Sequence, residues 1–110
     1  MELIETNNPK YLVLAIKGRL DTTNYSILEK RLMELIDGGQ NRILVDCRAM
    51  DYVSSSGLRI LLMALKKISL VKGRFVLCGL QENIREIFEI SGFTTIFEIY
   101  PDLVSAETAF

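Results

Sequence analysis

The sequence predicts one α/β domain in which four helices pack against a mixed, mostly parallel β-sheet that opens with a hairpin. Short apolar runs typical of strands alternate with longer segments whose apolar residues recur every three or four positions, as on one face of a helix. The hydrophobic share of 49% and the charged share of 25% are those of a globular protein. A chain of 110 residues has room for one hydrophobic core, so residues 1–110 are expected to form a single domain.

Two β-like runs, at residues 1–6 and 11–17, form the expected hairpin. The Asn-Asn-Pro-Lys segment at 7–10 separates them, and both Asn and Pro favour turns. Apolar residues occupy both faces of the second run, which is typical of a strand covered on both sides. The second run is therefore expected in the interior of the sheet.

Apolar residues at helical spacing predict three helices. They span residues 23–37, 56–72 and 81–91. Thr22 or Thr23 is expected to cap the first helix, because a hydroxyl can accept a bond from a free amide of the first turn. Gly38 is expected to end that helix in a left-handed conformation. The expected terminators of the other two are Gly73 and Gly92.

Continuous apolar runs at 43–45 and 75–78 predict buried parallel strands, and residues 96–100 predict a last strand. A short terminal helix follows Pro101. Its expected docking residues are Leu103, Ala106 and Phe110. The alternation of strands and helices places the helices against the sheet through right-handed crossovers.

Charge and hydropathy argue against nucleic-acid binding and against direct insertion into a membrane. Lys and Arg number 13 and Asp and Glu 14, so a net charge of −1 favours no polyanionic partner. No stretch approaches the roughly 18 consecutive apolar residues of a membrane span, and the first residues lack a signal-peptide pattern. Cys47 and Cys78 each close a short apolar run and are expected to be reduced, in keeping with a cytoplasmic location.

The residue inventory also argues against common catalytic and metal sites. With no histidine and 2 cysteines, the chain lacks the residues for a zinc site, a Ser-His-Asp triad or a Cys-His pair. Neither a P-loop nor a dinucleotide-binding glycine motif is present. We predict no catalytic residue, no metal and no cofactor, and we assign Asp46 and Asp51 to solvation and loop hydrogen bonds.

Three loops at the carboxyl ends of predicted strands are the candidate site, because ligand-facing residues collect there in open α/β sheets. They span residues 18–22, 46–57 and 79–81 and are expected to share one end of the molecule. The middle loop is unusual, since three serines, Ser54 to Ser56, directly precede a helix.

The three serines have two interpretations. One hydroxyl can cap the helix and stabilise the protein by about 1 kcal/mol, and a single serine is enough for that. Alternatively the serines are a modification site, because the free amides and dipole at a helix N-terminus favour an anion such as a phosphate.

Residues 52–58, Tyr-Val-Ser-Ser-Ser-Gly-Leu, preceded by Asp46 and by Gly-Arg-Leu-Asp at 18–21, resemble the STAS domain of bacterial anti-sigma factor antagonists. The resemblance covers essentially the whole chain. In that family the loop commonly reads aromatic-Met-Asp-Ser-Ser/Thr-Gly-Leu, and the first serine after the aspartate is phosphorylated. The resemblance implies phosphorylation at Ser55, with Ser56 and Ser54 as alternatives. Ser54 stands where the family has an aspartate, a departure that bears on recognition by a kinase.

Partner switching is the function that the resemblance implies. An unmodified antagonist binds an anti-sigma factor that is also a serine kinase, which frees the sigma factor for transcription, and phosphorylation of the antagonist ends the complex. The implied partner-binding residues surround the serine loop. They are Asp21, Thr22, Met50, Tyr52, Val53, Ser54, Ser56, Gly57 and Arg59.

Several of these residues have a second interpretation. Asp21 matches a family aspartate linked to partner and nucleotide contacts, and it also suits a helix cap. Met50, Tyr52 and Val53 are apolar interface candidates, or they turn inward and close the core. Arg59 lies one helical turn after the expected acceptor, so it either reaches a phosphate there or is an ordinary exposed helix residue.

Two other functions stay open. The departure at Ser54 is compatible with a STAS subunit of a transport system, such as a lipid-transporting ABC complex, in which the domain is structural. An enzyme that uses the serine loop is a third possibility, opposed by the missing histidines. As an antagonist, the protein is expected to be a monomer or a weak dimer.

Overall fold

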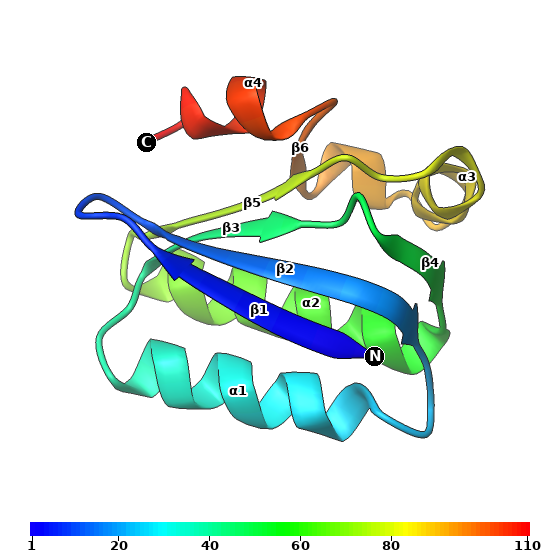
Figure 1. Cartoon of the computed structure of the whole chain (residues 1–110), viewed down its shortest axis with the longest axis horizontal. Helices are drawn as coiled ribbons and strands as arrows, with labels where there is room; N and C mark the ends of the chain where they lie inside the picture. The colour runs from blue at the N-terminus through cyan, green and yellow to red at the C-terminus, as the bar shows by residue number, and fades with distance from the viewer.

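The chain forms a six-stranded mixed β-sheet with helices on both of its faces, and the computed structural model describes all 110 residues (Figure 1). The strands are β1 (Glu2–Asn7), β2 (Leu12–Leu20), β3 (Arg42–Asp46), β4 (Met50–Val53), β5 (Arg74–Cys78) and β6 (Glu98–Tyr100). The helices are α1 (Tyr25–Asp37), α2 (Ser55–Leu70), α3 (Glu82–Ile90) and α4 (Leu103–Glu107), with a 3₁₀ turn, η1, at Phe93–Thr95. None of these helices combines the length and the hydropathy that a bilayer-spanning segment requires.

The sheet has one antiparallel pair, formed by the N-terminal hairpin. The strand order is β1-β2-β3-β5-β6, and β1 pairs with β2 from Glu2 opposite Lys17 to Asn7 opposite Leu12. Every other pair of neighbouring strands is parallel. The predicted hairpin and mostly parallel sheet are confirmed, and β2 lies inside the sheet as expected.

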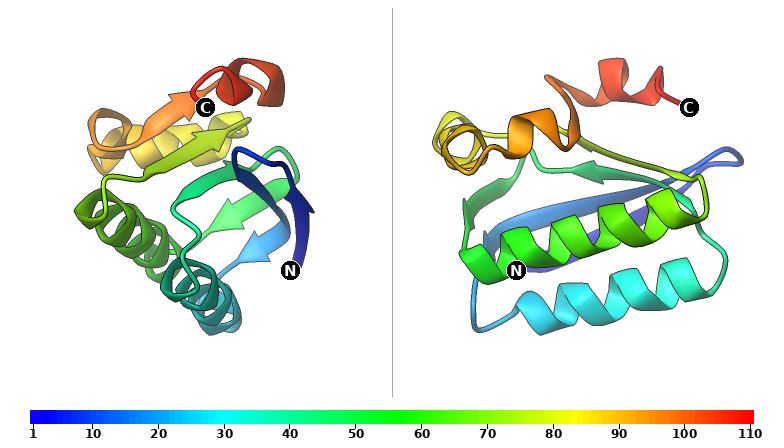
Figure 2. Two further views of the ribbon diagram at one scale, coloured as in Figure 1. Left: turned by 90° about the vertical axis from the view of Figure 1, so that its left-hand side faces the viewer. Right: turned by 180° about the vertical axis from the view of Figure 1, so that it is seen from behind.

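The two faces of the sheet carry different amounts of apolar packing. Helices α1 and α2 lie side by side on one face, α4 lies over the other, and α3 lies at one end (Figures 1 and 2). The larger core fills the space beneath α1 and α2, where Leu14, Leu28 and Leu61 are fully buried. A smaller cluster beneath α4 comprises Tyr11, Leu44, Val76, Cys78 and Ala106, with Leu103 and Phe110 packed against it. The predicted docking of the terminal helix is confirmed.

Strand β4 is a difference from the expected fold, because residues 50–53 were expected to lie in a loop. They pair in parallel with the last part of β2, Arg19 opposite Tyr52 and Leu20 opposite Val53. β2 extends to Leu20 rather than ending at residue 17, so its final residues offer an edge beyond the pairing with β3. Four residues, two of them exposed, are too few to show a strand period in the sequence.

The start of α1 also differs from the prediction that Thr22 or Thr23 caps it. The helix begins at Tyr25, and its N-cap residue, Asn24, makes no side-chain capping bond. The Asp21 carboxylate instead accepts bonds from the Thr23 amide (2.9 Å) and the Thr23 hydroxyl (2.6 Å). The Asn24 amide group donates to the Arg19 carbonyl at 2.8 Å, which ties this turn to the end of β2.

The predicted helix-ending glycines meet different backbone requirements. The prediction of a left-handed conformation at Gly38 is wrong, since this residue has φ −79°. Gly39 adopts that conformation instead, with φ +96°. After α2 the left-handed residue is Lys72, whereas Gly73 allows a close approach: a Cβ at Gly73 would lie 2.1 Å from the Asn41 carbonyl oxygen. Gly92, with φ +75°, ends α3 as expected.

Candidate functional site

The three predicted loops meet at one end of the molecule, as expected. The Ser54 amide donates to the Leu20 carbonyl at 2.9 Å, which joins the serine loop to the end of β2. The Gln81 side-chain amide donates to the Arg48 carbonyl at 3.0 Å, which joins the loop after β5 to the same region. The carboxyl ends of the strands therefore present one continuous surface.

Ser54 caps helix α2. It is the N-cap residue, with extended backbone angles, and its hydroxyl oxygen accepts a bond from the Gly57 amide at 3.1 Å. Ser and Asp are both favoured N-cap residues. A serine at the position where the family has an aspartate therefore keeps the cap and removes one negative charge.

Ser55 is the first residue of α2, and its side chain is exposed. Its hydroxyl makes no hydrogen bond to another protein group, and the capping bond of the helix is made by Ser54. The next residue, Ser56, is half-buried. The amides of Ser55 and Ser56 belong to the first turn, where no intrahelical carbonyl is available to them. The helix start thus offers a free hydroxyl beside free backbone donors.

Gly57 allows the first turn of α2 to pack against the end of β2. A Cβ at this position would lie 2.7 Å from Cγ of Leu20 and 3.1 Å from Cγ2 of Val53. Leu20 is fully buried, so it has little space into which to move. The absence of a side chain at Gly57 sets the position of the serines relative to the sheet.

Two of the predicted interface residues face the core instead of the surface. Met50 is fully buried, and Val53 is 3% exposed within the main hydrophobic cluster. Of the two interpretations given above, closing the core is the one that this burial supports, and neither side chain offers apolar surface to a partner. Gly57 is buried as well. Tyr52, with 37% of its surface exposed, remains available.

Arg19 joins the candidate site through Tyr52. Its guanidinium group lies over the Tyr52 ring, 4.1 Å from the ring centroid, and its Nε lies 3.4 Å from Oδ2 of Asp21. Hydrogen bonds from the hydroxyl and then the amide of Thr23 lower the pKa of Asp21, with a smaller contribution from Arg19. Asp21 is therefore ionised at neutral pH, and exposed Thr22 lies next to it.

The sequence did not single out Arg19 as a site residue. The signal for it is the cross-strand pairing of Arg19 with Tyr52, which requires β4 to be recognised as a strand. Arg59, in contrast, lies where the helical spacing places it, exposed on α2 and in no ion pair.

The buried carboxylate of Asp46 has a structural partner. Arg48 donates from Nε to Oδ1 at 2.9 Å and from a terminal nitrogen to Oδ2 at 2.8 Å. Burial on its own would raise the pKa of Asp46, but the hydrogen bonds from Arg48 outweigh that effect and lower it. The prediction of loop hydrogen bonds is confirmed for Asp46. The Asp51 side chain is exposed and makes none.

Both cysteines are free and buried. Burial raises the pKa of the Cys78 thiol to about 11 and that of Cys47 further, so both are protonated and unreactive at neutral pH. No group of three His, Cys, Asp or Glu side chains is placed to hold a metal ion.

Helix α2 starts at the carboxyl end of a mixed, mostly parallel sheet, with its cap at Ser54 and a free hydroxyl at Ser55. These features place the chain among the α/β domains. The family model described as "STAS domain" matches residues 2–106, so the chain belongs to the STAS domain family. Among its relatives is BtrV of Bordetella bronchiseptica, a candidate anti-sigma factor antagonist by its name. The two are 38% identical over 99 residues, which cover 90% of this chain and 85% of BtrV.

Solved structures share the fold. A protein of Thermotoga maritima, also described as a candidate anti-sigma factor antagonist, superposes with a TM-score of 0.93 and 19% identity, covering 97% of this chain and 92% of that chain. The Bacillus cell fate determinant SpoIIAA in its phosphorylated form superposes with a TM-score of 0.77 and 16% identity, covering 99% and 100%.

Proposed function

We propose that this STAS domain is a cytoplasmic anti-sigma factor antagonist that binds an anti-sigma factor and is released when a serine kinase phosphorylates Ser55. The observation that carries the proposal is the exposed, unbonded hydroxyl of Ser55 at the start of α2, beside a neighbour that already caps the helix. The name of BtrV and the phosphorylated form of SpoIIAA support it.

Charge explains how a phosphate at Ser55 would act. Phosphorylation adds about −1.5 to −2 charges and three acceptor oxygens. The first-turn amides and the helix dipole stabilise an anion at this position, so the fold has no need to change. A partner packed against the same surface loses its contact area and meets a new negative charge. Phosphorylation therefore ends binding without unfolding the domain.

The exposed and half-buried groups around Ser55 form the proposed partner surface. Tyr52 supplies a ring held by Arg19, and Asp21 supplies an ionised carboxylate fixed by the turn before α1. Aromatic rings and arginines are common anchors at interfaces because they bury much surface with little loss of side-chain freedom. Thr22 and Ser56 complete this surface.

Arg59 is the proposed internal partner of the phosphate. It lies four residues after Ser55 on the same helical face, and long side chains on helices lean toward the N-terminus. It forms no ion pair in the unmodified protein, so its guanidinium group is free to turn toward a phosphate. An arginine there would offset part of the added charge.

The direct test is phosphorylation by the cognate kinase. The purified protein is incubated with ATP and the serine kinase encoded beside it, and the intact mass is measured. We expect the gain of one phosphate, loss of that gain in Ser55→Ala, and its retention in Ser54→Ala and Ser56→Ala. The phosphorylated protein is then titrated with the anti-sigma factor by calorimetry, and binding should be lost.

Two outcomes would contradict the proposal. A phosphate that persists in Ser55→Ala would move the switch to a neighbouring hydroxyl. No modification by any cognate kinase, together with copurification with the ATPase of a transporter, would favour a structural role in a transport complex instead.

A further inference from the structure

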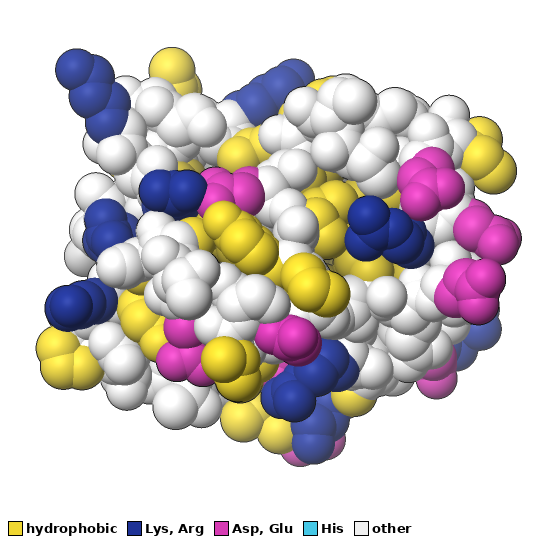
Figure 3. All heavy atoms as spheres, turned by 90° about the horizontal axis from the view of Figure 1, so that it is seen from above, with side chains coloured by type: hydrophobic (Ala, Val, Ile, Leu, Met, Phe, Trp, Pro, Cys, Tyr) yellow, Lys and Arg dark blue, Asp and Glu magenta, His cyan; other side chains and the backbone are white.

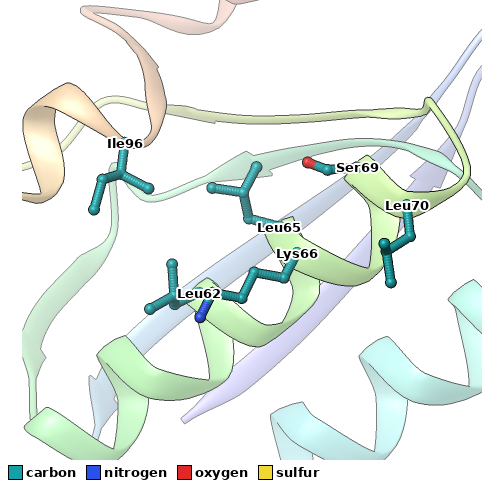
Figure 4. A pocket seen from close by; sticks show the side chains of 6 residues that line it. All are labelled: Leu62, Leu65, Lys66, Ser69, Leu70 and Ile96. Atoms are coloured by element: carbon teal, nitrogen blue, oxygen red, sulfur yellow. The ribbon is translucent and has the colours of Figure 1, made fainter.

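The far part of α2 borders an apolar groove that no other element covers (Figure 4). Its volume is about 570 Å³, and it lies between α2 and the segment that precedes β6. Its lining residues are Leu62, Leu65, Lys66, Ser69, Leu70 and Ile96. Leu70 is 84% exposed and Ile96 50% exposed. Covering these two side chains with a partner would remove apolar surface from water and favour binding.

The surface of α2 beside the groove is basic: Lys66 lines the groove itself, and Arg59 and Lys67 line the adjoining hollow on the same helix. Helix α2 contains Arg59, Lys66 and Lys67 and no acidic residue. These three side chains are exposed, and none of them forms an ion pair. They recur at the spacing of one helical face, the face that also carries Leu62 and Leu70. A complementary segment would therefore be acidic and would carry an apolar side chain.

Helix α3 of the same chain has these properties. Glu82, Glu86 and Glu89 are exposed, and Figure 3 shows acidic side chains gathered at the end of the molecule where α3 lies. Glu89 pairs with Arg85 at 3.3 Å, which leaves Glu82 and Glu86 without a cationic partner. Ile90, at the end of the helix, is 88% exposed.

We infer that the groove beside α2 of one copy of this chain receives helix α3 of a second copy. In this contact Ile90 enters the apolar groove, while Glu82 and Glu86 face Lys66 and Lys67. The lengths agree, since α3 and residues 62–70 of α2 each have nine residues and extend about 12 Å along the helix axis. The groove and helix α3 are different patches, and every copy carries both, so the contact is heterologous.

The inference does not rest on the proposed function. Residues 62 and 70 lie about 10 Å and 22 Å along the α2 axis from Ser55. Loss of self-association would leave phosphorylation at Ser55 unaffected, and the absence of phosphorylation would leave self-association unaffected.

The primary test is sedimentation equilibrium of the full chain from about 10 µM to about 1 mM. A small contact dominated by exposed charges is weak, and we expect a dissociation constant on the order of 0.1–1 mM at low salt. Raising the salt to about 0.5 M should weaken association about tenfold, because exposed charges are screened. A monomeric mass at every concentration would overturn the inference and would leave the groove to an acidic segment of another protein.

Charge reversal tests the orientation of the contact. Lys66→Glu with Lys67→Glu gives copies whose two surfaces are both acidic, and Glu82→Lys with Glu86→Lys gives copies whose two surfaces are both basic. Each double variant alone should be monomeric, and an equimolar mixture should associate at least as tightly as the unmodified protein. All four positions are exposed, and circular dichroism checks that the variants fold. A mixture that stays monomeric would contradict the proposed pairing.

The apolar part of the contact has a matched control. Ile90→Ser should weaken association at least about fivefold, because the residue loses its place in the groove. The control is Val104→Ser, which changes another exposed aliphatic residue. Val104 is 77% exposed, lies on α4 outside both surfaces, and its substitution should have no effect. Equal effects of the two substitutions on association would contradict the placement of Ile90 in the groove.

Discussion

The two ends of helix α2 differ in charge and in how their polar groups are satisfied. At the first end Ser54 caps the helix, Ser55 is free, and the nearest unpaired donors are backbone amides. Toward the second end stand Lys66 and Lys67, with Lys67 in the last turn. The helix dipole favours an anion at the first end and cations at the second. The same helix can therefore accept a phosphate at one end without strain and present a basic surface at the other.

The largest expected effect follows from placing a negative charge at the first end. Ser55→Asp should lower the affinity for the anti-sigma factor by at least about 100-fold, because a desolvated carboxylate enters the contact. Its midpoint of thermal unfolding should be unchanged or slightly raised, since an acidic residue in the first turn suits the dipole. Calorimetric titration and a thermal melt measure the two quantities on the same sample.

Ser55→Asn separates charge from size in that experiment. Asn has nearly the same shape as Asp and no charge, so binding should stay within a few-fold of the unmodified protein. Equal losses for Asn and Asp would mean that the contact rejects bulk rather than charge, and the electrostatic account of the switch would then be wrong.

The next effect concerns the packing that positions the first end. Gly57→Ala should destabilise the domain by about 2 kcal/mol, because the added methyl group would lie 2.7 Å from Cγ of buried Leu20. Alanine has the higher helix propensity, so an unobstructed site would gain stability instead. Urea denaturation measures the change. Ser69→Ala, at an exposed position of the same helix, should stay within about 0.5 kcal/mol.

Removal of the hydroxyl should lower the stability of the protein at Ser54 and leave it almost unchanged at Ser55. Ser54→Ala should cost about 1 kcal/mol of unfolding free energy, because the Gly57 amide loses its acceptor. Ser55→Ala should change stability by less than about 0.5 kcal/mol, since its hydroxyl makes no bond in the folded protein. Urea denaturation measures both variants. Reversed magnitudes would assign the cap to Ser55 and remove the free hydroxyl on which the comparison depends.

Patterns within one element predicted most of the fold. The opening hairpin, the buried parallel strands and the helices with Leu28 and Leu61 facing inward follow from periods that each segment carries by itself. Strand β4 does not follow from such a period. It pairs with the part of β2 that continues past the end of β3. The predicted cap of α1 was wrong for a similar reason, because Asp21, Thr23 and Asn24 form hydrogen bonds with one another before the helix begins.

The candidate site was predicted in location but not in composition. The serine loop and its neighbours were found because strand ends in such sheets share an edge. Burial of Met50 and Val53 could not be decided, because an apolar residue in a short segment suits the core and an interface equally. Arg19 was missed because its role depends on the ring of Tyr52, and this neighbour arises only from the pairing of β2 with β4.

The smallest expected effect links the two ends of α2 through Arg59, which lies between them. In the phosphorylated protein Arg59→Ala should lower the unfolding free energy by about 0.5 kcal/mol, because a helical neighbour at this spacing can pair with the added charge. In the unmodified protein the same substitution should have no effect, since Arg59 forms no ion pair there. Lys67→Ala, three turns from the phosphate, serves as the control in both states. Equal stability of the phosphorylated Arg59→Ala variant and the phosphorylated parent protein would mean that the backbone amides alone hold the phosphate.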